Sequence, residues 1–391
     1  MRVLMVSTEY PPLLGGVGRY TANLTLALRK AGIHVEVVCD GPGGQYSGLA
    51  PTNTRNSEVL LRIVEEAKPD VVHVQFEPGL YGLILDSKNP KKSGTYIDSF
   101  YKECTTPIVT TFHTAYKFEQ WMSMAAVIKK TGRTGRVGIP ARAAVKTWKH
   151  FLNYRAFNEL NREKLRRSRA GICFSRYLSK RIGGGNVIYH GAEPAVPEPI
   201  DKESARASLS LPAEKRIAIA VGFMTITKGW DMLRNMHLPE GWIIVVNSSR
   251  SHYNVETLEA KFDGDRIVDL HRGHLSERDF SLLLFSADAV LLPYKVTAGS
   301  GVMFDALGHG IPFVSARLDF FREFAELGLG VTAKRTARDF SKALHVLDRN
   351  YDQYSDAVRS FRSKLKWDCV ATQHIEVYRS VVKADLKKKE R

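Results

Sequence analysis

The sequence predicts an α/β protein made of two doubly wound halves, each a parallel sheet covered by helices. Three observations support this prediction. The chain has 391 residues, too many for one ordinary hydrophobic core, and fits two domains of roughly 150–200 residues. Short apolar strands alternate with amphipathic helices in both halves, a pattern typical of parallel sheets. Glycines and prolines interrupt this alternation near the middle of the chain.

In the first half, strands and helices are expected to alternate from the N-terminus. Arg2–Ser7 is an apolar strand, and the loop Tyr10–Gly18 leads into an amphipathic helix at Arg19–Lys30. The other predicted strands are Val35–Cys39, Val71–Phe76, Ile108–Phe112 and Gly171–Ser175, and the other helices are Glu58–Ala67 and Phe151–Arg167.

A glycine run at Gly183–Gly185, a short strand at Asn186–Tyr189 and the proline-rich Glu193–Pro199 mark the expected crossing into the second half. The predicted strands there are Ile217–Gly222, Trp242–Asn247, Ile267–Asp269, Ala289–Tyr294 and one beginning at Ile311, and the helices are Gly229–Met236, Ser276–Phe285 and Trp367–Val381. We expect an N-terminal domain at residues 1–188, a linker at 189–203, a C-terminal domain at 204–365, a helix at 366–382 that could return to the N-terminal domain, and a frayed basic tail at 383–391.

Composition excludes several classes of protein. No apolar run approaches the ~20 residues that a membrane-spanning helix needs. The N-terminal apolar run is too short for a signal peptide. The four cysteines lie far apart and form no CxxC pair, so we expect neither a metal clip nor a disulfide framework. A reducing cytoplasm fits this cysteine usage best.

Positive charge is concentrated in one segment. Between Lys117 and Arg181 there are 17 lysines and arginines and 3 acids, a net charge of +14 out of +16 for the whole chain. We call this segment the basic belt. Such a concentration favours an anionic partner over a solvated helical face, because solvated faces usually mix the two signs.

The segment from 287 to 316 predicts an anion site in the second half. A turn of small residues before a helix leaves backbone N–H groups at the positive end of the helix dipole. One acid lies about a turn inside that helix, placed to accept hydrogen bonds from hydroxyl groups. A nucleoside diphosphate suits this pairing better than a free phosphate. The residues are Thr297, Ala298, Gly299, Ser300, Gly301 and the acid Asp305.

Four other loops carry unusual residues at the ends of predicted strands, where open α/β sheets bind ligands. Lys228 is expected at a helix start beside Gly229, where a cation would meet a pyrophosphate. His113 ends a strand and could hydrogen-bond a substrate hydroxyl or act structurally. Glu77 and Gln75 end another strand and could face the same ligand.

The fourth loop, Gly15-Gly16-Val17-Gly18, could bring backbone N–H groups close to a phosphate or a sugar. A dinucleotide-binding GxGxxG motif is excluded, because Thr21 stands where the third glycine belongs.

The chain resembles the GT-B glycosyltransferases of the large retaining family 4 type, and the resemblance covers nearly all of it. The motifs occur in family order: MVSTEYPPLLGGVGRYTANLTLALRKAGIHVEVV, KPDVVHVQ, TTFHT, ICFSRYLS, VIYHGAEP, VGFMTITKGWDML and RGHLSERDFSLLLFSADAVLLPY. The resemblance implies two Rossmann-like domains with a cleft between them, the donor on the C-terminal half and the acceptor on the N-terminal half.

The resemblance also implies roles for single residues. His113 would take the position of the active-site histidine near the transferred sugar, and Lys228 would hold the pyrophosphate. Asp305 would stand for the second glutamate of the Glu-x7-Glu motif, which binds the ribose. Gly16 would lie near the phosphates of the donor. The acceptor is expected near Gly15, Gly18, Glu77 and Thr114.

Two residues depart from the family pattern. Phe223 stands where the family usually has an arginine, and Thr297 stands where it has the first glutamate of Glu-x7-Glu. Losing the arginine removes a charge-assisted bond worth ~1.5–3 kcal/mol, so the backbone donors of the 297–301 turn must hold more of the anion. Both departures occur together in a branch of the family that reads G-F-x4-KG and LPY…SGV. They therefore indicate a variant site, not a dead enzyme.

The implied reaction is the transfer of a hexosyl group from a UDP- or GDP-sugar, with retention and without a cofactor. No Asp-x-Asp pair is present, and helix N-termini with Lys228 can neutralise the leaving diphosphate, so no metal is expected.

The basic belt favours a peripheral enzyme at the inner face of the plasma membrane, with a lipid-linked or glycan acceptor. Apolar and aromatic residues next to lysines suit the headgroup layer of an anionic membrane. The residues expected to face it are Trp121, Lys129, Lys130, Lys146, Trp148 and Lys149.

Three alternatives remain open. A nucleic-acid-binding protein would explain the basic belt but not the phosphate site, and no nucleic acid is expected. A nicotinamide-dependent oxidoreductase would need the GxGxxG motif that fails here. A pseudoenzyme would keep the fold and lose transfer.

Overall fold

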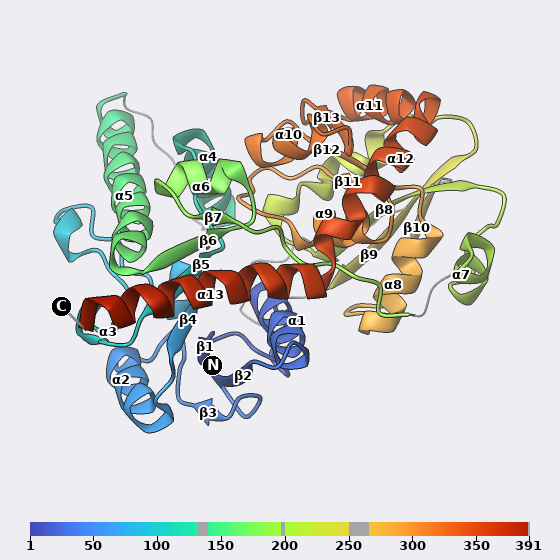
Figure 1. Cartoon of the computed structure of the whole chain (residues 1–391). Helices are drawn as coiled ribbons and strands as arrows, with labels where there is room; N and C mark the ends of the chain where they lie inside the picture. Colours follow the sequence, from blue (N-terminus) through green and yellow to red (C-terminus); the bar gives the residue numbers. More distant parts are fainter. Residues whose placement is uncertain (132–139, 197–199, 250–265, 390–391) are drawn as a thin grey trace. The chain divides into compact units, whose positions relative to one another are not determined.

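The computed structural model describes residues 1–131, 140–196, 200–249 and 266–389. The chain divides into two compact units: unit 1 comprises Met1–Tyr189 and Asp368–Arg391, and unit 2 comprises His190–Trp367. Each unit is a parallel sheet flanked by helices (Figure 1). The predicted doubly wound α/β class is confirmed.

Unit 1 contains a seven-stranded sheet in the order β3-β2-β1-β4-β5-β6-β7. Its strands are β1 (Arg2–Val6), β2 (His34–Cys39), β3 (Tyr46–Ser47), β4 (Val71–Phe76), β5 (Ile108–Phe112), β6 (Ala170–Cys173) and β7 (Asn186–Val187). Its helices are α1 (Gly16–Lys30), α2 (Asn56–Ala67), α3 (Asp98–Glu103), α4 (Phe118–Thr131), α5 (Pro140–Arg167), α6 (Arg176–Ile182) and α13 (Trp367–Lys389), with 3-10 turns η1 (Pro78–Tyr81) and η2 (Pro90–Lys92). The central strands β4 and β5 are buried along their whole length, which explains their continuous apolar character.

Unit 2 contains a six-stranded sheet in the order β10-β9-β8-β11-β12-β13. Its strands are β8 (Arg216–Phe223), β9 (Trp242–Ser249), β10 (Ile267–Asp269), β11 (Ala289–Leu292), β12 (Phe313–Ala316) and β13 (Gly330–Ala333). Its helices are α7 (Lys202–Ser208), α8 (Glu277–Ser286), α9 (Gly301–Gly308), α10 (Asp319–Ala325), α11 (Ala337–Arg349) and α12 (Tyr351–Arg362), with 3-10 turns η3 (Ile226–Lys228), η4 (Trp230–Asn235) and η5 (Ser363–Leu365).

The structure corrects several predicted elements. Helix α1 begins at Gly16, not at Arg19. The segment predicted as a helix at Gly229–Met236 is a 3-10 turn, η4. Strand β11 ends at Leu292 and not at Tyr294, because Pro293 has no N–H to continue the ladder.

The C-terminal tail 383–391 was predicted to fray, and for residues 383–389 this prediction is wrong; residues 390–391 lie outside the described residues. Helix α13 continues to Lys389, and Figure 1 shows it in red beside α1 within unit 1. Asp385 is 8% exposed and pairs with Arg169 at 3.4 Å. This partly buried ion pair joins α13, near its C-terminal end, to Arg169.

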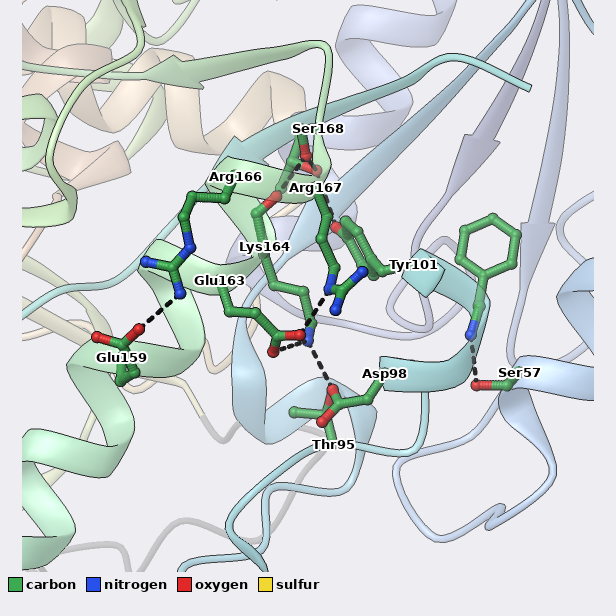
Figure 2. Close-up of polar contacts among 12 residues, drawn as sticks. Ser57, Thr95, Asp98, Tyr101, Glu159, Glu163, Lys164, Arg166, Arg167 and Ser168 are labelled. Carbon is green, nitrogen blue, oxygen red and sulfur yellow. Dashed lines mark hydrogen bonds and ion pairs between the residues drawn. The ribbon is translucent and has the colours of Figure 1, made fainter. Parts of the chain in front are cut away.

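A buried ion pair joins α5 to α3 in unit 1 (Figure 2). The side chain of Lys164 is completely buried, and its Nζ lies 2.7 Å from Asp98 Oδ1 and 3.2 Å from Glu163 Oε2. The same ammonium lies 5.1 Å from the centre of the Tyr101 ring. Two carboxylates and an aromatic face therefore replace the water that the ammonium loses on burial.

Candidate functional site

The candidate site in unit 2 lies where the strand order reverses. Strand β8 pairs with β9 on one side and with β11 on the other, so the chain leaves β8 and β11 in opposite directions. Open α/β sheets bind ligands in the gap that this reversal leaves at the carboxyl edge. Lys228 follows β8, and the 297–301 turn with Asp305 follows β11. The topology thus groups all the predicted donor-binding residues of unit 2 at one edge.

The ammonium of Lys228 lies on an aromatic face at this edge. Its Nζ is 3.8 Å from the centre of the Tyr294 ring, a distance typical of a cation–π contact. The Tyr294 hydroxyl lies 3.4 Å from Ser300 Oγ. No carboxylate pairs with Lys228 among the residues that the structure describes. The ammonium is therefore held in place without being neutralised by an acid.

Helix α9 begins with the backbone donors expected for an anion site. Ser300 is its N-cap, and Ser300 Oγ accepts the Met303 N–H at 3.2 Å. Thr297 Oγ1 donates to the Gly299 carbonyl and accepts the Gly299 N–H. The side chain of Thr297 therefore shapes the turn from within. Asp305 lies one turn further along α9 and is 3% exposed.

Two residues at this edge were not singled out from the sequence. Arg335 donates to the Pro293 carbonyl at 3.0 Å and to the Gly229 carbonyl at 3.3 Å, and so ties the loop after β8 to the loop after β11. Gly229 has φ of 69°, and a Cβ there would lie 2.2 Å from the Pro293 oxygen, so only glycine fits. The His190 ring stacks on Phe304 of α9 with centres 5.6 Å apart.

Unit 1 has a second reversal of strand order, between β1 and β4. The loop after β1 places the carboxylate of Glu9 at the N-terminus of α1. Glu9 Oε2 accepts the N–H groups of Val17 at 2.9 Å and Gly18 at 3.0 Å. The chain therefore supplies its own anion to this helix terminus. Glu9 was not predicted from the sequence, although an acid three residues after a buried strand was a usable signal.

The three glycines of this loop differ in their surroundings. A Cβ on Gly15 would lie 1.8 Å from the Glu9 carboxyl group, and one on Gly18 would lie 3.1 Å from the Glu9 backbone. A Cβ on Gly16 would meet nothing within 4 Å. Gly15 and Gly18 thus make room for Glu9, whereas Gly16 leaves an open surface.

Glu77 and Thr114, both predicted near the acceptor, lie close to Glu9. The Glu77 carboxylate accepts the Gly79 N–H at 3.2 Å. Burial raises the pKa of Glu77 to about 7; the hydrogen bond from the Gly79 N–H opposes this rise, and the charge of Glu9 adds to it. Glu77 can therefore exchange a proton near neutral pH.

His113 lies at the end of β5 and is partly buried. Its ring meets the ring of Tyr20 edge-on at 5.7 Å and that of Phe174 at 5.1 Å. His113 Nε2 lies 3.0 Å from Gln75 Oε1 at the end of β4. The fold thus brings His113 and Gln75 together, a contact that was not predicted from the sequence.

The described part of the basic belt comprises α4, α5, β6 and most of α6. Trp148 is 59% exposed and stacks on Phe151, and Lys149 beside it is exposed. Trp121 instead packs on Phe157 of α5 at 5.3 Å, so it helps to join the two helices. The side chains of Lys129, Lys130 and Lys146 lie outside the described residues. In the described part of the chain, no helix is both long enough and apolar enough to cross a membrane.

Comparison with known proteins links the sequence of unit 1 to a family. Residues 14–186 match the model of Glycosyltransferase Family 4. Glycogen synthases from two strains of Mycobacterium tuberculosis are 39% identical to this chain over 69 residues. These matches cover 17% of this chain and 16% of the relatives, so the chain matches about one sixth of their length.

Solved structures with the same two-unit fold extend over nearly the whole chain. Sucrose-phosphate synthase from Thermosynechococcus elongatus has a TM-score of 0.69 at 15% identity and covers 98% of this chain and 100% of its own. HepE from Anabaena in complex with UDP and glucose has a TM-score of 0.60 at 13% identity, covering 97% and 100%. The catalytic domain of starch synthase IV from Arabidopsis thaliana, bound to ADP and acarbose, has a TM-score of 0.59 at 14% identity, covering 98% and 99%. At these identities the similarity establishes the fold.

Proposed function

We propose that this chain, a group 1 glycosyltransferase with the GT-B fold, transfers a hexosyl group from a UDP- or GDP-sugar to an acceptor hydroxyl with retention at the anomeric carbon. One observation carries the proposal. The Lys228 ammonium is fixed on Tyr294, without a carboxylate partner among the described residues, beside the N-terminus of α9. A cation and a helix N-terminus at one sheet edge are suited to a diphosphate.

The donor is assigned to unit 2. Lys228 and the N–H groups of Ala298, Ser300 and Gly301 would hold the diphosphate and stabilise it as it leaves. Gly299, whose N–H bonds Thr297 Oγ1, would keep the turn in shape around it. Asp305 would accept hydrogen bonds from the ribose. These groups would make a metal ion unnecessary. The UDP and ADP named for structures of the same fold support a nucleotide donor.

The acceptor is assigned to unit 1. His113 would hydrogen-bond the transferred sugar, and Gly16 would present its open surface to the donor phosphates. Glu77 and Thr114 would bind the acceptor hydroxyls, with Gly15 and Gly18 holding the loop close to Glu9. The leaving phosphate would take the acceptor proton, so no separate carboxylate base is required.

A panel of UDP-, GDP- and ADP-sugars in a thermal-shift and calorimetric assay tests this proposal. The preferred donor at 100 times its Kd should stabilise the protein by about 2.7 kcal/mol. Asp305→Ala should weaken the binding of that donor, whereas Asp356→Ala, on the exposed face of α12, should leave the binding unchanged. If none of the nucleotide-sugars in the panel stabilised or bound the protein, a nucleotide-sugar donor would be rejected. Binding without sugar transfer to any acceptor would favour the pseudoenzyme.

We place the enzyme in the cytoplasm, peripherally on the inner face of the plasma membrane, with a lipid-linked or glycan acceptor. The net charge of the basic belt and the exposed Trp148 beside Lys149 support this. In a flotation assay, vesicles containing phosphatidylserine should recover more protein than phosphatidylcholine vesicles, and salt should reduce the difference. Trp148→Ala combined with Lys149→Ala should lower recovery. Equal recovery from both kinds of vesicle would overturn the membrane assignment.

A further inference from the structure

A chain of buried polar side chains leads from helix α13 to His113 inside unit 1. Tyr378 OH lies 2.6 Å from His73 Nδ1, and His73 Nε2 lies 3.3 Å from Gln75 Nε2. Gln75 Oε1 then lies 3.0 Å from His113 Nε2. Tyr378, His73 and Gln75 are completely buried. Residues from the C-terminal helix and from β4 thus reach a histidine at the end of β5.

The partners fix the direction of each hydrogen bond. The amide oxygen of Gln75 can only accept, so His113 must carry its proton on Nε2. The amide nitrogen of Gln75 can only donate, so His73 Nε2 accepts, and the Thr111 hydroxyl at 2.7 Å can also donate to it. His73 then carries its proton on Nδ1 and donates to Tyr378. Reversing His73 alone would set its N–H against the Gln75 amide N–H at 3.3 Å, so reversal of His73 favours reversal of the Gln75 amide and of His113 as well.

His73 remains neutral in this arrangement. Burial holds the pKa of His73 well below its usual range, and the neighbouring rings of His374 and His113 lower it further. A neutral imidazole has one donor and one acceptor, and both are used here. His73 therefore couples the direction of its hydrogen bond with Tyr378 to the direction of its hydrogen bond with Gln75, and it does not supply a charge.

We infer that Tyr378 of α13 is a positioning residue that acts through His73 and Gln75 to fix the tautomer and orientation of His113. This inference rests on the proposed function for its catalytic meaning. It assigns a task to α13: the helix at the end of the chain selects which nitrogen of His113 carries the proton. If Tyr378 had only a structural role, its buried hydroxyl would need a hydrogen bond with His73, but either of the two could be the donor.

The imidazole ¹⁵N signals of the full-length protein test this inference directly. His113 is identified by the signals that disappear in His113→Asn. In the wild type, Nε2 of His113 should be protonated. Tyr378→Phe removes the acceptor of His73 and should increase the population of His113 with the proton on Nδ1, and Gln75→Met should do so too. Tyr101→Phe is the matched control, because Tyr101 is 4% exposed and its hydroxyl bonds Thr110, which is not part of the series of hydrogen bonds from Tyr378 to His113.

Activity gives a second readout. With the donor chosen by the panel, Tyr378→Phe should lower kcat about tenfold or more, as expected for a misplaced catalytic group, and leave the KM for the donor unchanged. An unchanged His113 tautomer in both Tyr378→Phe and Gln75→Met would overturn the inference. A changed tautomer in a protein that transfers no sugar would instead reject the proposed function and leave the positioning intact.

Discussion

Lys228→Ala is expected to lower kcat/KM for the nucleotide-sugar by about 100- to 1000-fold, or ~2.7–4 kcal/mol of transition-state stabilisation. The reason is that the other cations considered at this edge are either missing from the sequence or already engaged. Phe223 occupies the position where the family pattern has an arginine. Arg335 donates to the carbonyls of Pro293 and Gly229 and pairs with Asp231. In the proposed reaction, the charge of the leaving diphosphate would therefore depend chiefly on Lys228.

Steady-state kinetics with three further variants separates charge from packing. Lys342→Ala, on the exposed face of α11, should leave kcat/KM unchanged. Tyr294→Phe keeps the aromatic face under the ammonium and should retain most of the activity. Tyr294→Leu removes that face and should lower kcat/KM further. Full activity in Lys228→Ala would place the diphosphate somewhere other than the edge between β8 and β11.

Asp98→Ala is expected to lower the free energy of unfolding by about 3 kcal/mol, near the lower end of the range for breaking a buried ion pair. Lys164 is completely buried, so removing Asp98 leaves an ammonium that water does not reach. Glu163 remains 3.2 Å away and limits the loss (Figure 2). Urea unfolding followed by circular dichroism measures the change through the midpoint at constant slope.

Two controls complete this measurement. Glu58→Ala breaks an exposed pair with Arg55 in the same unit and should cost about 0–1 kcal/mol. Combining Lys164→Met with Asp98→Leu removes both charges and should recover most of the stability lost in Asp98→Ala. A loss in Asp98→Ala no larger than in Glu58→Ala would mean that water reaches the Lys164 ammonium.

Most strands of the two sheets were predicted from the sequence, because buried parallel strands are short apolar runs; the strands β3 and β13 were not predicted. Val71–Phe76, Ile108–Phe112 and Ile267–Asp269 were predicted at the bounds that the structure has. The same reasoning identified Lys228 and the 297–301 turn, since each follows such a strand. The start of α1 was missed because Glu9, seven residues before Gly16, provides its capping contacts.

Contacts between distant segments could not be predicted in this way. Arg335 follows β13 and looks like any surface arginine until the fold brings it to Gly229. Tyr378 lies 305 positions after its partner His73, and neither residue has a spacing that reveals the other. The buried Lys164 likewise reads as one more cation of the basic belt, and only the packing of α5 on α3 distinguishes it.

The carboxylate of Glu9 competes with external anions for the backbone N–H groups at the N-terminus of α1. Any phosphate or carboxylate that approached the N–H groups of Val17 and Gly18 would first have to displace a group covalently attached to the same loop and 6% exposed. Repulsion between like charges would add to the cost, since Glu77 lies close by. The N–H groups of Val17 and Gly18 are therefore closed to a second anion, and in the proposed reaction only the open surface at Gly16 is left in this loop for the donor phosphates.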